Sequence, residues 1–172
     1  TLTEEQLKQL YDYPITGTEL QVRKRTEIRD LFVLQCLVGQ RVGDMQKFFN
    51  GDNEKDEEED TISIIQQKTK ARAIIPLTPL AKEIISKYQN TELKYYKPSN
   101  SNLNAELRII AEEAGLNIPI TFEDKDGKQV KPLFELVHTH TARHTFITIM
   151  CRRDIPKETI IIATGHEDTK MI

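Results

Sequence analysis

The 172-residue chain has few cysteines and no long apolar run, and both absences restrict what it can be. No stretch approaches the roughly 20 apolar residues that a membrane-spanning helix needs. The N-terminus, Thr1-Leu-Thr-Glu-Glu, lacks the basic and apolar regions of a secretory signal peptide, so we expect a cytoplasmic protein without membrane contact. The two cysteines, Cys36 and Cys151, lie among apolar neighbours on predicted helices, which favours buried free thiols over a disulfide or a metal pair.

A net positive charge, typical of DNA-binding proteins, is also absent, because the formal net charge is −3. Residues 51–60 alone contain seven acidic residues and one basic residue, and the rest of the chain contains 23 basic and 20 acidic residues. We expect this acidic run to be a solvated, mobile segment without chemistry. The alternatives are a loop on the face opposite DNA, or one that competes with phosphate for a basic cleft.

Local signals predict one domain that is mainly α with small antiparallel β-hairpins (α+β). The capping boxes Thr3-x-x-Gln6 and Thr18-x-x-Gln21 begin two helices, and Gly39 ends the second of them. Further helices are predicted over residues 42–49, 79–88, 104–114, 142–152 and 159–163. Two hairpins are predicted, one from residues 62–65 and 73–75, the other from residues 118–122 and 130–137 with Asp126-Gly127 in its turn.

Basic side chains with phosphate-binding chemistry gather in the C-terminal third, as His140-x-x-Arg143-His144 and then His166. A helix that begins just before Arg143 would hold it in the first turn, where free backbone N–H groups and the helix dipole favour an anion. Arg41, in the turn after the long apolar helix, supplies a second guanidinium. Two arginines and two histidines that converge would bind a phosphate.

The order of these residues resembles the catalytic domain of the tyrosine recombinases, the phage integrase family. The likeness covers nearly the whole chain and consists of Gly39-x-Arg41-x-x-Asp44, Lys68 in a lysine-rich hairpin, His140-x-x-Arg143-His144, and Gly165-His166. It implies five catalytic residues, namely Arg41, Lys68, His140, Arg143 and His166. It also implies Asp44 and His144 as supporting residues, with Asp44 orienting Arg41, and Lys70 and Arg72 as DNA contacts.

The resemblance implies site-specific DNA recombination or integration through a 3′-phosphotyrosyl intermediate. The partners would be double-stranded DNA and three further copies of the chain, in a bacterial, phage or mobile-element setting. No cofactor or metal is expected, because guanidinium groups can stabilise the phosphorane charge and the chain has no carboxylate cluster of the metal-nuclease kind. Lys68 would protonate the 5′ leaving oxygen. The family's nucleophilic tyrosine would fall near position 175, so we expect a single catalytic domain that lacks both this segment and an N-terminal DNA-clamping domain.

Several other interpretations of the same residues stay open. His140 and His144, with His138 or His166, could bind zinc, although this leaves both arginines without a role. His144 could be a buried core histidine, and His138 is expected to be structural. The loop of residues 94–97 could stack on nucleic acid or anchor its rings in the core. A DNA-binding relative without catalysis is a third possibility, since none of the five tyrosines occupies the family position.

Overall fold

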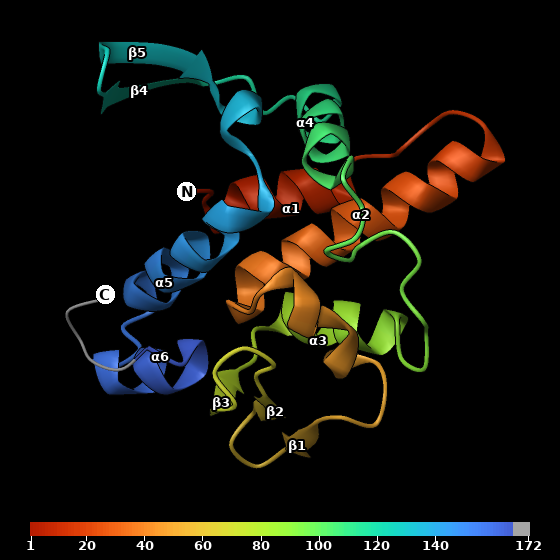
Figure 1. Ribbon diagram of the computed structural model, residues 1–172, viewed down its shortest axis with the longest axis vertical. Helices are drawn as coiled ribbons and strands as arrows, with labels where there is room; N and C mark the ends of the chain where they lie inside the picture. The colour runs from red at the N-terminus through yellow and green to blue at the C-terminus, as the bar shows by residue number, and fades with distance from the viewer. Residues whose placement is uncertain (167–172) are drawn as a thin grey trace.

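A computed structural model gives the structure of the protein, and it describes residues 1–166 (Figure 1). Its α-helices are α1 (Glu4–Asp12), α2 (Glu19–Val38), α3 (Pro79–Lys87), α4 (Leu103–Glu113), α5 (Ala142–Arg152) and α6 (Lys157–Thr164). Its 3-10 helices are η1 (Val42–Phe48), η2 (Leu133–Leu136) and η3 (Thr139–Thr141). Its strands are β1 (Glu54–Asp56), β2 (Thr61–Ile65), β3 (Arg72–Pro76), β4 (Pro119–Asp124) and β5 (Gly127–Pro132). The prediction of a mainly α fold with small antiparallel hairpins is confirmed.

Helix α2 forms the centre of the core, and α1, α3, α4 and α5 all pack against it (Figure 1). Its second half, from Ile28 to Val38, is buried, in keeping with the apolar run in the sequence. Both predicted capping boxes are present, with Thr3 capping α1 and Thr18 capping α2. Gly39 ends α2 at φ 70°, and a Cβ there would lie 2.5 Å from a ring carbon of Phe146 on α5. Glycine therefore permits both the turn and the close approach of α5.

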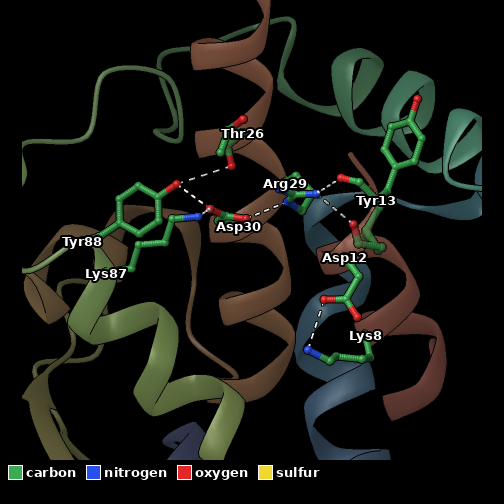
Figure 2. Close-up of polar contacts among 9 residues, drawn as sticks. Lys8, Asp12, Tyr13, Thr26, Arg29, Asp30, Lys87 and Tyr88 are labelled. Carbon is green, nitrogen blue, oxygen red and sulfur yellow. Dashed lines mark hydrogen bonds and ion pairs between the residues drawn. The ribbon is translucent and has the colours of Figure 1, made fainter. Parts of the chain in front are cut away.

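An ion network around the buried Asp30 fixes α1 and α3 onto α2 (Figure 2). The carboxylate of Asp30 is fully buried and accepts hydrogen bonds from Arg29 Nε at 2.6 Å, Lys87 Nζ at 2.7 Å and the Tyr88 hydroxyl at 2.7 Å. Arg29 Nη1 in turn donates to the Tyr13 carbonyl at 2.8 Å, just after α1. Burial and the Asp30 charge raise the pKa of Tyr88 well above its usual value. The network satisfies a buried carboxylate and so lets polar groups hold three helices together.

The strands β1, β2 and β3 form one antiparallel sheet, and α6 packs on β3. The turn of residues 66–71 joins β2 to β3. The acidic run was predicted to be a solvated, mobile loop, and the loop part of this is wrong for residues 54–56, which pair with β2 as an edge strand. Every acidic side chain of the run is still exposed. The backbone gains sheet hydrogen bonds while the charges stay in water, so the acidic composition does not prevent an edge strand.

The second hairpin, β4 and β5, projects from the body of the molecule (Figure 1). Its turn lies at Lys125-Asp126, and Gly127 follows at φ 101°. The predicted second strand over residues 130–137 is too long, because β5 ends at Pro132 and η2 begins at the next residue. Proline has no N–H group with which to continue a ladder, and the buried Leu133 then turns the chain into the core.

Cys151 and the loop of residues 94–97 differ in how far they reach the core. Cys36 is buried as predicted, but the prediction is wrong for Cys151, which is exposed because α5 directs Ile149 and Met150 to the core instead. Residues 94–97 anchor a ring in the core, since Tyr96 is only 1% exposed. Within residues 1–166, no helix combines the length and the apolar character needed to cross a membrane.

Candidate active site

A cleft of about 770 Å³ lies where the C-terminal end of α2 meets the start of α5 and the β2–β3 hairpin. Its lining includes five of the residues singled out in the sequence, namely Arg41, Asp44, Lys68, His140 and Arg143. Segments that are about 100 residues apart in sequence therefore meet in one site. The cleft is rich in cations, because Lys97 lines it as well.

Each of the cleft residues occupies the end or turn of an element. Arg41 is the N-cap residue of η1, directly after the turn that ends α2. Arg143 lies in the first turn of α5, and His140 lies in η3 just before it. Lys68 is exposed in the turn between β2 and β3. Side chains at such ends point into the space between elements, which is why four separate segments can share one cleft.

The two arginines have buried donor atoms that nothing in the described residues satisfies. Nη1 of Arg41 and Nη1 of Arg143 are both buried without a hydrogen-bond partner within residues 1–166. Arg143 is held by its other nitrogen, since Nη2 donates to the Thr164 carbonyl at 2.7 Å. Burial, then the charge of Arg41, lower the pKa of Arg143 to about 10, while Asp44 raises it. The guanidinium stays cationic at neutral pH, and the pair forms a site for an anion with bidentate acceptors.

His166 follows Gly165, which ends α6 at φ 76°. Its Nδ1 lies 2.6 Å from the Thr164 hydroxyl, and that hydroxyl donates to the Ile160 carbonyl at 2.9 Å. The hydroxyl oxygen is thus left to accept from Nδ1–H, which makes Nε2 the free ring nitrogen. His166 does not line the cleft, but burial, then the charges of Arg143 and Arg41, lower its pKa. The imidazole is therefore neutral at pH 7 and close enough to sense both guanidinium groups.

Asp44 makes different contacts from the predicted one. Its Oδ1 accepts from the Gln67 backbone N–H at 2.9 Å and pairs with Lys47 Nζ at 3.1 Å, and the described residues show no ion pair between Asp44 and Arg41. The expected bond that orients Arg41 is therefore not present. Asp44 instead joins η1 to the turn that carries Lys68.

Three further residues lie outside the cleft. Lys70 and Arg72 line a separate hollow of about 530 Å³ beside β2, where Arg72 pairs with Glu54 at 2.9 Å. His144 is exposed on α5, so the alternative of a buried core histidine is wrong. Its charge contributes to the lowered pKa of His166. The zinc alternative has no ligand group in residues 1–166, where no three histidine, cysteine, aspartate or glutamate side chains gather in a metal-binding arrangement.

Three buried glutamines around the cleft were missed from the sequence. Gln35, Gln40 and Gln66 are each at most 2% exposed. Gln35 Nε2 donates to the Gln40 carbonyl at 2.9 Å, and the Tyr96 hydroxyl donates to Gln35 Oε1. The only available signal was the position of Gln35 inside the apolar run of α2. Glutamine is common on surfaces, so its residue type alone indicates nothing.

Comparisons with known proteins agree on one family. A model of the phage integrase family matches residues 1–172. No curated protein matches the chain. Similar solved structures include XerA recombinase (TM-score 0.59, 18% identity, 99% of this chain and 56% of that chain). They also include XerH site-specific recombinase bound to its difH substrate before cleavage (TM-score 0.60, 16% identity, 99% of this chain and 48% of that chain). A third is XerH bound to a palindromic difH substrate after cleavage (TM-score 0.59, 16% identity, 99% of this chain and 47% of that chain). The chain thus spans about half the length of these structures.

Proposed function

The chain belongs to the phage integrase family, and from this premise we propose that its cleft binds the scissile phosphate of duplex DNA in site-specific recombination by the tyrosine-class reaction. The observation that carries the proposal is the pair of guanidinium nitrogens, Nη1 of Arg41 and of Arg143, buried without partners among the described residues. A non-bridging phosphate oxygen would satisfy both donors, and it becomes more negative in the transition state.

The proposed chemistry is an in-line displacement at phosphorus. A tyrosine oxygen forms a bond to phosphorus, the bond from phosphorus to the 5′ oxygen breaks, and the product is a 3′-phosphotyrosyl intermediate. Lys68 gives a proton to the departing 5′ oxygen, and an imidazole, His140 or His166, takes the proton of the nucleophile. The free Nε2 and lowered pKa of His166 suit it to accept a proton near neutral pH.

The nucleophile is proposed to lie beyond residue 172. No tyrosine lines the cleft within the described residues. The half-buried Tyr88 and the buried Tyr96 have pKa values raised by burial, so both stay neutral phenols and are poor nucleophiles. We further propose that strand exchange takes place in a homotetramer on two duplexes, with a separate N-terminal domain that grips the DNA. The XerH structures are bound to DNA substrates, which supports duplex DNA as the partner.

A covalent adduct would test the proposal. A chain that carries these residues and the tyrosine should form a protein–DNA adduct that resists denaturation when incubated with DNA of the source element. Arg143→Ala should abolish the adduct, and the matched variant Arg23→Ala, on the exposed start of α2, should keep it. No adduct from the wild type, or an adduct retained by Arg143→Ala, would contradict the assignment.

The second candidate, a DNA-binding relative without catalysis, gives a different result. It would bind duplex DNA without forming an adduct. Four cations line the cleft, Arg41, Lys68, Lys97 and Arg143, so the slope of log affinity against log salt should be about −3 to −4 in either case. Binding that is independent of ionic strength would argue against both candidates.

A further inference from the structure

One buried side chain contacts the three segments that carry Lys68, Arg41 and His166. Gln66 is fully buried at the end of β2, two residues before Lys68. Its Nε2 donates both hydrogens, one to Gln40 Oε1 at 2.9 Å and one to the Thr164 carbonyl at 3.0 Å. Its Oε1 accepts from the Thr69 hydroxyl at 2.6 Å. The Gln66 amide is thus bonded to Thr69 beside Lys68, to Gln40 beside Arg41, and to Thr164 two residues before His166.

The contacts of Gln66 continue into the arginines. Gln40 directly precedes Arg41, and its own Nε2 donates to the carbonyl of Ala163 at 2.7 Å. The Thr164 carbonyl that accepts from Gln66 also accepts from Arg143 Nη2 at 2.7 Å. The bonds from Gln40 to Ala163 and from Arg143 to Thr164 do not involve Gln66, so they keep both guanidinium groups in place when the Gln66 amide is lost.

The turn before His166 rests directly on the same amide. A Cβ on Gly165 would lie 2.3 Å from Gln66 Oε1, so a side chain at position 165 would force the hydrogen-bonded Gln66 amide to move. The glycine lets the backbone contact the glutamine. The turn before His166 thus lies directly against the Gln66 side chain.

The turn that carries Lys68 depends on the amide as well. Lys70 N donates to the main-chain carbonyl of Gln66 at 3.0 Å, and Ala71 N donates to the Thr69 hydroxyl at 3.2 Å. The Thr69 hydroxyl uses its own hydrogen on Gln66 Oε1. Loss of the amide would free Thr69 and allow the turn to change shape. Lys68 is exposed, and the described residues offer its ammonium group no bond that would hold it in place.

We propose that Gln66 is a positioning residue that holds Lys68 in register with Arg41 and His166. The inference rests on the proposed function, because it assigns Lys68 as the proton donor. Glutamine fits the position because both neighbours of its Nε2 are oxygen acceptors, which a glutamate would repel. A misplacement of about 1 Å can cost about 100-fold in rate, so a group that sets register affects catalysis without touching DNA.

The test is Gln66→Met in a chain that also carries the nucleophilic tyrosine. Single-turnover cleavage should fall about 100-fold, while DNA affinity should change less than about twofold. A substrate with sulfur in place of the bridging 5′ oxygen needs no proton donor, because a thiolate is a good leaving group. This substrate should restore cleavage by Gln66→Met and by Lys68→Ala, but not by Arg143→Ala.

The matched control is Gln46→Met. Gln46 also uses its amide to hold backbone, donating to the Thr91 carbonyl at 2.8 Å and accepting from Leu93 N at 2.7 Å, but it does not line the cleft. The Gln46→Met variant should lose about as much stability as Gln66→Met and keep the wild-type cleavage rate. If Gln66→Met loses activity equally on the oxygen and the sulfur substrate, its effect does not pass through Lys68 and the proposal is overturned.

Two further measurements test the role of Gln66 if the first variant does not fold or the wild type forms no adduct. If Gln66→Met fails to fold, Thr69→Val removes only the hydroxyl that donates to Gln66 Oε1. This variant should show the same rescue by the sulfur substrate, with a smaller loss of rate of about tenfold. A rate unchanged by Thr69→Val would overturn the proposal. If the wild type forms no adduct, the proposed function fails, and hydrogen exchange still tests the positioning. The amides of Lys70 and Ala71 should exchange faster in Gln66→Met than in Gln46→Met, and equal rates would refute the role of Gln66.

Discussion

Replacing Arg41 with methionine should make the DNA-free protein more stable. Nη1 of Arg41 is buried without a partner in residues 1–166, and a second cation, Arg143, lies close enough to have its pKa lowered by it. A buried donor left unsatisfied costs about 1–3 kcal/mol. Arg41 is only partly buried, so we take the lower end and expect a gain of about 1 kcal/mol, since methionine keeps the apolar stem and removes the donor.

Urea unfolding with and without inorganic phosphate would measure this effect. The wild type should gain stability as phosphate fills the site, by about 2.7 kcal/mol at a concentration 100 times the dissociation constant. Without phosphate, Arg41→Met should have a higher free energy of unfolding than the wild type, and phosphate should raise it much less. Arg23→Met is the control, because Arg23 is exposed and paired with Glu19, and its effect should stay within about 0.5 kcal/mol.

Two results would contradict a phosphate site at Arg41. If Arg41→Met destabilises the protein by about 1 kcal/mol or more, the donor is not a cost in the free protein and contributes to folding instead. If phosphate stabilises the variant as much as the wild type, the anion binds elsewhere. Either result would remove the observation on which the phosphate site depends.

Other perturbations probe pH dependence, a turn and the ion network. Burial and nearby cations lower the pKa of His166, so the unfolded chain binds more protons in mild acid and stability should fall as the pH drops through about 6.5. In His166→Gln the urea midpoint should depend less on pH in this range, and an unchanged pH dependence would disprove the lowered pKa of His166. Gly39→Ala should cost roughly 2–4 kcal/mol in urea unfolding, since its φ is positive and its Cβ would meet Phe146, whereas Gly51→Ala, with open space around it, should cost less than about 0.5. Asp30→Ala should cost about 3–5 kcal/mol, because it leaves the guanidinium of Figure 2 buried and unpaired, and a change in melting temperature near zero would show that the network is dispensable.

The helix boundaries could be predicted because their causes are local. Thr3 and Thr18 cap helices by bonding to backbone three residues ahead, and Gly39 ends α2 through its own φ. The strand in the acidic run could not be predicted this way. Its partner, β2, lies beyond a turn, and the charged side chains of residues 54–56 give no apolar alternation. Pairing between segments depends on the backbone of both, which composition does not describe.

The candidate site was only partly accessible from the sequence. Residue type and order pointed to Arg41, Lys68, His140 and Arg143, and these four line one cleft. The bonds around them could not be predicted, because the Thr164 carbonyl that accepts from Arg143 and from Gln66 is positioned by the packing of α6 on β3. The catalytic roles of the four stay predictions until the cleavage assays are done.

The contacts that Asp44 makes in place of the predicted one suggest how the site avoids neutralising itself. Had Asp44 paired with Arg41, a phosphate would have to break an ion pair in order to bind, and the carboxylate would repel it. Asp44 instead uses its charge on Lys47 and on the Gln67 amide, while Arg143 is oriented by a neutral carbonyl. Neutral acceptors fix the direction of a guanidinium without cancelling its charge. Within residues 1–166 two cations thus keep one buried donor each without a partner, and in the proposed function this cost in stability becomes affinity when a phosphate binds.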